Sequence, residues 1–230
     1  MKKVFIGVGH GGSDPGAVAN SVREKDLNLA VALSCNEELV RHGVITRMSR
    51  TTDENDSLKE EIGECNAFGP ELAVDLHNNA GGGDGAEAFY HHGGGKGKIL
   101  AENILREIAL IGQNSRGAKT KTNSAGRDYY GFIRETACPA VIVECAFVDN
   151  AADLAIVDTA EEQKAMGIAI AKGILATLGI SWIPPVTELP EEPFEPEKAD
   201  VKTEENDPFW EKFRLMLKEA LERLVRWLDI

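Results

Sequence analysis

The feature that most constrains the fold is an alternation of short apolar runs with longer amphipathic segments over residues 1–180. The apolar runs predict strands: KVFIGV, VITRMS, ELAVDLHNN, AEAFYHH, YYGFI and PAVIVECAF. Helical segments lie between them, such as KDLNLAVALSCNEELVRHG, KGKILAENILREIALIG and AEEQKAMGIAIAKGILATLG, and Asp56 or Ser57 can begin another. Such alternation predicts an α/β domain with a largely parallel sheet and helices on both faces.

A change of composition near Ile180 divides the chain. Residues 181–205 contain five prolines and many acids, which favours an extended linker. Residues 206–230 predict an amphipathic helix with a heptad-like apolar stripe: Trp210, Phe213, Leu217, Ala220, Leu224 and Trp227. We therefore expect a main domain over 1–180, an acidic Pro-rich linker over 181–205 and a C-terminal amphipathic helix over 206–230.

Charge and hydropathy exclude several classes of function. The net charge of −13 argues against nucleic-acid binding, which selects basic faces. No apolar run reaches 18 residues, so we expect no transmembrane segment. The apolar run near the N-terminus, VFIGV, is too short for a signal peptide, so we expect synthesis in a cytoplasm without one.

Polar residues with catalytic potential fall where strands end. His10 follows VFIGVG, His77 follows LAVDL, Glu144 lies within or at the end of PAVIVE, and Glu24 begins the first helix. Ligands of open α/β sheets bind outside the carboxyl ends of the strands. Two imidazoles and a carboxylate form a catalytic zinc shell with one open position, and a second carboxylate supplies a general base.

The spacing of these four residues does not by itself establish a metal site. The intervals are 14, 53 and 67 residues, and no HExxH sequence is present. Capping and turn residues at strand ends would give the same pattern.

Longer stretches around these residues carry more information. GHGGSDPGA, with a glutamate about a dozen residues further on, is followed by LHNNA and then by RETACPAVIVECAFVDN. In this order, over roughly residues 3–178, the chain resembles the zinc-dependent N-acetylmuramoyl-L-alanine amidases of the amidase-3 family. The resemblance implies a twisted, mostly parallel six-stranded sheet, Zn²⁺ bound by His10, Glu24 and His77, and Glu144 as the catalytic residue.

The same resemblance implies a substrate and its contacts. The substrate is peptidoglycan, and the bond hydrolysed joins N-acetylmuramic acid to L-alanine of the stem peptide. Asn79 and Arg134 are candidates for substrate binding, although structural hydrogen bonds or an ion pair explain them as well. Family members usually have an arginine in the second helix, where this chain has Glu60 or Glu61.

Three functional alternatives follow for the whole chain. The first is a phage or prophage endolysin, or an autolysin, that reaches the cell wall through a holin or after lysis. The second is a non-catalytic module that binds muropeptides, and the third is another zinc peptidase acting on cell-wall peptides. The helix over 206–230 can form a homo-oligomer, pack on the main domain, or bind the wall or a membrane. Its mixed charges suit salt bridges better than a membrane surface.

Overall fold

The computed structural model describes residues 1–185 and residue 218. Its strands are β1 (Lys3–Val8), β2 (Val18–Ala19), β3 (Val22–Arg23), β4 (Ile45–Met48), β5 (Leu72–Asn79), β6 (Ala86–Tyr90), β7 (Ser115–Lys119) and β8 (Ala140–Phe147). Its helices are α1 (Glu24–Arg41), α2 (Leu58–Phe68), α3 (Lys96–Leu110), α4 (Gly131–Glu135), α5 (Ala151–Leu154) and α6 (Ala160–Leu178). The predicted helix over 206–230, except residue 218, and the predicted linker beyond 185 lie outside the described residues.

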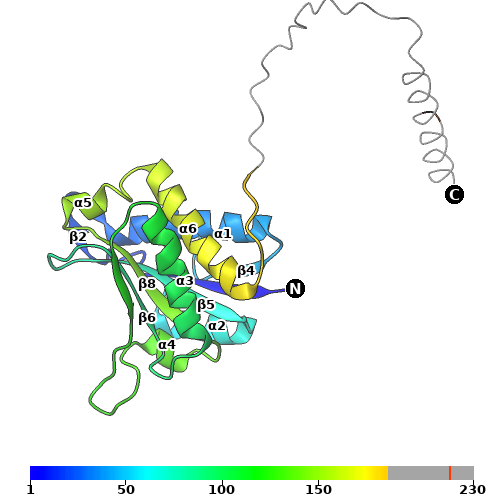
Figure 1. Cartoon of the computed structure of the whole chain (residues 1–230). Coiled ribbons are helices and arrows are strands. Elements are labelled where there is room, and N and C mark those ends of the chain that lie inside the picture. Colours follow the sequence, from blue (N-terminus) through cyan, green and yellow to red (C-terminus); the bar gives the residue numbers. More distant parts are fainter. Residues whose placement is uncertain (186–217, 219–230) are drawn as a thin grey trace, which may run out of the picture. The chain divides into compact units, whose positions relative to one another are not determined.

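One six-stranded sheet organises the domain, with the strand order β4-β1-β5-β8-β6-β7 (Figure 1). Neighbouring strands are parallel except for β6 and β8, which are antiparallel. The strands β2 and β3 form a separate two-stranded hairpin ahead of α1. The predicted α/β class with a mostly parallel six-stranded sheet is therefore confirmed.

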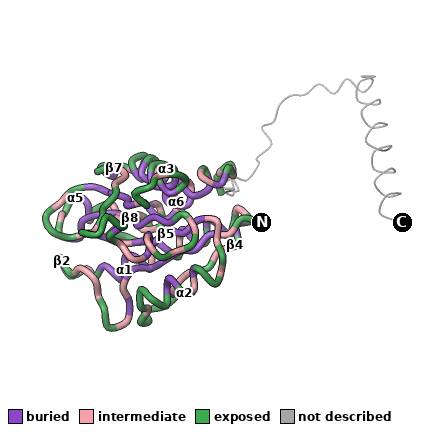
Figure 2. The backbone as a smooth tube through the Cα atoms, turned by 90° about the horizontal axis from the view of Figure 1, so that it is seen from below, coloured by how far each residue is buried: buried purple, intermediate pink, exposed green. Residues whose placement is uncertain are grey.

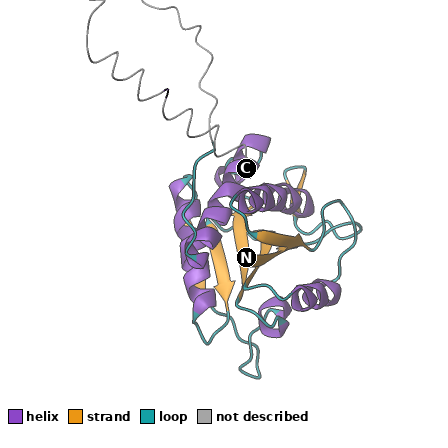
Figure 3. Cartoon of the chain, turned by 90° about the vertical axis from the view of Figure 1, so that its right-hand side faces the viewer, coloured by secondary structure: helices purple, strands orange, loops and turns teal. Residues whose placement is uncertain are grey.

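The two faces of the sheet are covered differently. Helices α1, α3 and α6 bury one face, and α6 packs against both of the others (Figure 1). The shorter helices α2 and α4 cover the opposite face, where a smaller core includes Phe5, Phe89 and Phe132 (Figure 3). Figure 2 shows buried residues concentrated along the central strands. Because successive strand residues point to opposite faces, the four inner strands β1, β5, β8 and β6 each contribute to both cores.

The sequence prediction was wrong for one strand. Residues 129–133, YYGFI, do not form a strand: Tyr130 precedes the short helix α4, and both Phe132 and Ile133 are buried in the smaller core. The sixth strand is instead β7, whose sequence SRGAK is polar and largely solvent-accessible. An edge strand of this kind has no apolar alternation to detect, while a five-residue helix is too short to show a helical period.

Local signals fix both ends of α2. Ser57 and Glu60 form a reciprocal capping box at the start of α2. Gly69 ends the same helix in the left-handed conformation, at φ 63°. The capping box confirms Ser57, rather than Asp56, as the residue that begins this helix.

The described chain continues beyond α6 along the surface of α1. The indole nitrogen of Trp182 donates to Glu38, and the ammonium of Lys172 lies 4.0 Å from the centre of the Trp182 ring. The Ile183 amide donates to Nε2 of His42 at 2.9 Å. Among the described residues, no helix combines the length and the apolar character needed to cross a membrane.

Candidate active site

The loop after β1 brings His10 to the site in an unusual backbone conformation. His10 has φ 62°, in the left-handed region that few non-glycine residues adopt. Reciprocal backbone hydrogen bonds of 2.9 Å between Gly11 and Asp14 close the loop beside it. The buried guanidinium of Arg50 donates to the carbonyls of Val8, at 3.1 Å, and Gly9, at 3.3 Å. These contacts hold the loop in a conformation that it would not favour alone.

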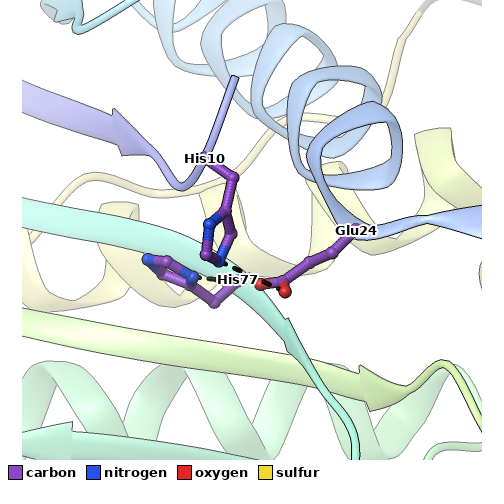
Figure 4. Close-up of side chains that lie close together, drawn as sticks. All are labelled: His10, Glu24 and His77. Carbon is purple, nitrogen blue, oxygen red and sulfur yellow. Dashed lines mark hydrogen bonds and ion pairs between the residues drawn. The ribbon is translucent and has the colours of Figure 1, made fainter. Parts of the chain in front are cut away.

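His10, Glu24 and His77 converge on one point from three different elements (Figure 4). Nε2 of His10 lies 3.2 Å from one oxygen of Glu24, and Nδ1 of His77 lies 3.1 Å from the other. The two imidazole rings are nearly perpendicular, with centres 5.1 Å apart. Glu24 is buried, and its carboxylate also accepts the Ala17 amide at 2.8 Å.

A second carboxylate holds each imidazole from the far side. Asp14 lies 2.8 Å from Nδ1 of His10, and Asp75 lies 3.1 Å from Nε2 of His77. These contacts direct Nε2 of His10 and Nδ1 of His77 toward the shared centre. Carboxylate–histidine pairs of this kind fix the ring orientation and the tautomer of metal-binding histidines. Asp75 is buried, whereas the Asp14 side chain is 65% exposed.

Two glycines make room for the converging side chains. A Cβ atom on Gly9 would lie 2.2 Å from the His77 ring, and one on Gly16 would lie 2.6 Å from both His10 and Glu24. Gly16 also has φ 65°, which disfavours any side chain. The space that these two glycines leave is occupied by the protein's own imidazoles and carboxylate.

Glu144 lies beside this cluster because of strand register. It is the register partner of His77 on β8, and Glu87 on β6 is its partner on the other side. Neighbouring partners in a sheet point to the same face, so the three residues form a row across β5, β8 and β6. Burial raises the pKa of Glu144 to about 7, and the negative charges of Glu24, Asp75 and Glu87 act in the same direction. A carboxylate with such a pKa can both accept and return a proton near neutral pH.

The charges of the cluster are strongly coupled. The hydrogen bond to Glu24 raises the pKa of His10 despite an opposing effect of burial. Burial lowers the pKa of His77, but its contacts with Asp75 and Glu24 outweigh this effect and leave that pKa well above the usual range. Burial alone would raise the pKa of Glu24, yet the two imidazoles hold it well below normal. The three carboxylates Asp14, Glu24 and Asp75 therefore surround the two imidazoles, a charge arrangement that favours a cation.

A cleft of about 270 Å³ opens next to the two histidines on the α2 and α4 side of the sheet. Its lining includes His10 and His77, the Tyr130 and Phe132 side of α4, and Glu61. Glu61 is the member of the pair Glu60 and Glu61 that faces the site, while Glu60 caps α2. Burial raises the pKa of Glu61 well above normal, and the charge of nearby Asp75 adds to the effect.

Two cations at the sheet edge were not anticipated from the sequence. Nε of Arg116 lies 2.9 Å from the Glu87 carboxylate, and the Lys119 ammonium contacts the same oxygen. The Arg116 guanidinium also lies 5.0 Å from the centre of the Phe147 ring. Asn79, a predicted substrate contact, donates to Glu87 at 3.2 Å and so joins this end of the row.

Arg134, the other predicted substrate contact, is engaged elsewhere. Its guanidinium donates to the backbone carbonyls of Asp128 and Tyr129, at 2.8 and 2.9 Å, and forms an ion pair with Glu135. Arg134 therefore holds the loop before α4. Sequence spacing could not show which of Arg134 and Arg116 lies near Glu144, because that depends on the contacts of each side chain in the folded chain.

Together, the mostly parallel sheet, the His–Glu–His donor set and the adjacent half-buried Glu144 form an arrangement suited to metal-assisted hydrolysis. Sequence comparison gives the particular family. Residues 4–176 match the family model Amidase_3, described as N-acetylmuramoyl-L-alanine amidase. The chain belongs to this family, as the resemblance in the sequence indicated.

Individual relatives agree with the family assignment. The chain is 37% identical over 157 residues to N-acetylmuramoyl-L-alanine amidase CwlM of Bacillus licheniformis, covering 66% of this chain and 59% of CwlM. It is 32% identical over 164 residues to the endolysin of Bacillus phage SPP1, covering 67% of this chain and 58% of the endolysin. The solved structure of Cwp6 from Clostridium difficile superposes with a TM-score of 0.76 at 38% identity, covering 77% of this chain and 29% of that one. This chain therefore covers less than two thirds of the length of both CwlM and the endolysin.

Proposed function

We propose that this chain hydrolyses the amide bond between N-acetylmuramic acid and L-alanine in bacterial peptidoglycan, with Zn²⁺ held by His10, Glu24 and His77. The observation that carries the proposal is the convergence of these three side chains beside Glu144, their neighbour in the sheet. Membership of the amidase family supplies the substrate class.

The three residues fit a zinc ion. Two imidazole nitrogens and a carboxylate are a common catalytic donor set, and donors of a tetrahedral zinc lie roughly 3.4 Å apart. The distances of 3.2 and 3.1 Å between the imidazole nitrogens and the Glu24 oxygens are close to that spacing. Asp14 and Asp75 leave one nitrogen of each ring directed at the centre.

The chemistry divides between the metal and Glu144. When bound, zinc supplies Lewis acidity, which polarises the scissile carbonyl and makes a water molecule acidic near neutral pH. Glu144 accepts the proton of the attacking water and returns it to the departing amine of L-alanine. The carboxylates of Asp14 and Asp75 hold the imidazoles during these transfers.

For substrate binding, we propose Asn79 and Arg116 rather than Arg134. Arg116 is held by Glu87 and by the Phe147 ring close to Glu144, and about a third of its side chain remains accessible. A fixed guanidinium is suited to a carboxylate of the stem peptide. The cleft beside the histidines has carboxyl groups, including Glu61 and Asp75, but no lysine or arginine among its described lining residues, so it is less suited to such a group.

The reaction is tested on purified peptidoglycan with the zinc-loaded chain. New N-terminal alanine without new reducing sugar ends identifies the amidase. Reducing ends would indicate a glycosidase, and new amino groups on other residues would indicate a different cell-wall peptidase. Binding of muropeptides without any cleavage would show a non-catalytic module.

We further propose that the chain acts as a phage or prophage endolysin that reaches the wall through a holin or after lysis. Its similarity to the SPP1 endolysin supports this setting. Expression in a host should then leave cells intact until the membrane is permeabilised, after which they lyse.

A homo-oligomer through residues 206–230 stays a prediction. Sedimentation of the full chain, compared with that of a chain ending at Ile180, tests it.

A further inference from the structure

Four of the chain's five histidines lie in two separate clusters. His10 and His77 belong to the candidate active site, and His91 and His92 follow β6. Because β6 is antiparallel to β8, its end at Tyr90 is paired with Val141, near the start of β8 and away from Glu144. The second pair of histidines therefore lies toward the opposite end of these strands from the proposed catalytic residues.

His91 and His92 converge on a single carboxylate oxygen. Nε2 of His91 lies 3.0 Å, and Nδ1 of His92 lies 2.8 Å, from the same Oδ2 of Asp128. The two rings are stacked, with centres 4.5 Å apart. These three donors and the His10, Glu24 and His77 set are the two groups within the described part of the chain whose spacing could hold a metal ion.

Hydrogen bonds hold Asp128 in one position, whereas the exposed imidazoles of His91 and His92 can rotate. Its side chain is 3% exposed, and its Oδ1 accepts the His92 amide at 2.8 Å. Its backbone carbonyl accepts from Arg134 at 2.8 Å. The imidazole side chains are about half exposed, so they can turn about their own bonds without disturbing the core.

We propose that His91, His92 and Asp128 form a second divalent metal site, which takes Zn²⁺ or a similar ion. Two imidazole nitrogens and one carboxylate oxygen are donors that zinc accepts, and the remaining positions are open to water.

Metal binding at Nε2 of His91 places the ring proton on Nδ1. That nitrogen now accepts the Gly93 amide at 3.0 Å, so this hydrogen bond has to open. Gly93 is followed by Gly94 and Gly95, which lets the loop move away.

The site would act on structure rather than on the reaction itself. Asp128 belongs to the loop between β7 and α4, and the histidines belong to the end of β6. A shared metal would therefore clamp this loop to the sheet. The same loop leads into Tyr130, which lines the catalytic cleft and packs on Phe89 with ring centres 4.8 Å apart.

The test is zinc content per chain, measured on tag-free full-length protein after equilibration with zinc and removal of the excess. We expect two zinc ions in the wild type, one after the double change His91→Ala and His92→Ala, and one after His10→Ala. Arg127→Ala, an exposed change next to Asp128, should retain two. A double variant with the same zinc content as the wild type, whether one or two, would overturn the second site. Unchanged zinc in His10→Ala would instead count against the proposed active site.

Thermal stability of the His10→Ala protein gives an independent measurement. A ligand that binds the folded chain raises the melting temperature by mass action. Excess zinc should raise it in His10→Ala, and the rise should disappear when His91→Ala and His92→Ala are added. In amide spectra of the same protein, the Gly93 signal should shift on zinc addition. The absence of a melting shift in His10→Ala would contradict the proposal and leave the carboxylate as a hydrogen-bond acceptor only.

Discussion

His77 on β5 and Glu144 on β8 are register partners in neighbouring parallel strands. This single pairing joins the proposed metal shell to the proposed proton acceptor. Both side chains leave the sheet on the face that α2 and α4 cover. The chemistry of the site therefore depends on the register of two central strands as much as on any loop.

Gly9→Ala should disrupt the site from within the backbone. The new Cβ would lie 2.2 Å from the His77 ring, so the ring or the β1 loop has to shift. We expect a loss of about 1–3 kcal/mol in the free energy of unfolding and weaker zinc binding. Gly63→Ala is the matched control, because no atom lies within 4 Å of its added Cβ in α2. Chemical denaturation measures the free energy of unfolding, and zinc titration measures the affinity for zinc. Equal effects at Gly9 and Gly63 would argue against the packing explanation.

Asp75→Asn should weaken zinc binding by roughly 10–100-fold. The amide cannot support the His77 imidazole as a carboxylate does, although it retains the size of the side chain. Asp14→Asn makes the same change on His10, but Asp14 is mostly exposed and solvent can partly replace it. Competition with a chelator should therefore rank the wild type tightest, Asp14→Asn next and Asp75→Asn weakest. The reverse ranking would contradict the importance assigned to burial.

Zinc affinity should increase with pH through the neutral range. In the metal-free protein, carboxylates raise the pKa values of His10 and His77, so both rings retain protons to a higher pH than usual. Zinc has to displace those protons, and its affinity is lost as the pH falls through these raised values. Titration of zinc at several pH values measures the dependence. An affinity that stays constant from pH 5 to 8 would show that the two rings are already neutral.

Arg116→Gln should raise KM with a much smaller effect on kcat. The change removes the positive charge near Glu144 but leaves the proposed metal ligands intact. Arg134→Gln is the comparison, because that guanidinium binds loop carbonyls. Its main effect should be on stability. Steady-state kinetics on a soluble muropeptide separates the two parameters, and an unchanged KM in Arg116→Gln would remove this residue from substrate binding.

The apolar patterns predicted most of the sheet because its central strands are buried on both faces. KVFIGV and PAVIVECAF illustrate this, since nearly every residue in each is buried. The edge strand β7 was missed because its Arg116 and Lys119 form ion pairs with Glu87 and add no apolar pattern. YYGFI was mistaken for a strand for a different reason: its buried apolar residues lie on a helix of five residues, which is too short to show a helical period.

The candidate site could be predicted only in part. His10, Glu24, His77 and Glu144 were recognised from the stretches around them, whereas their meeting point depends on register and on the left-handed turn at His10. Asp75 was hidden inside an apolar run, where its role depends on the imidazole two residues away. Arg50 donates from the interior to backbone carbonyls at the end of β1, and no pattern in the sequence around it indicates this role.

Glu144→Gln tests the central claim most directly. The amide preserves the size of the side chain but cannot accept a proton, so hydrolysis of purified peptidoglycan should fall by at least about 100-fold. Zinc content and folding should match the wild type, because His10, Glu24 and His77 are unchanged. Release of N-terminal alanine at a near-normal rate by the zinc-loaded Glu144→Gln protein would contradict the account.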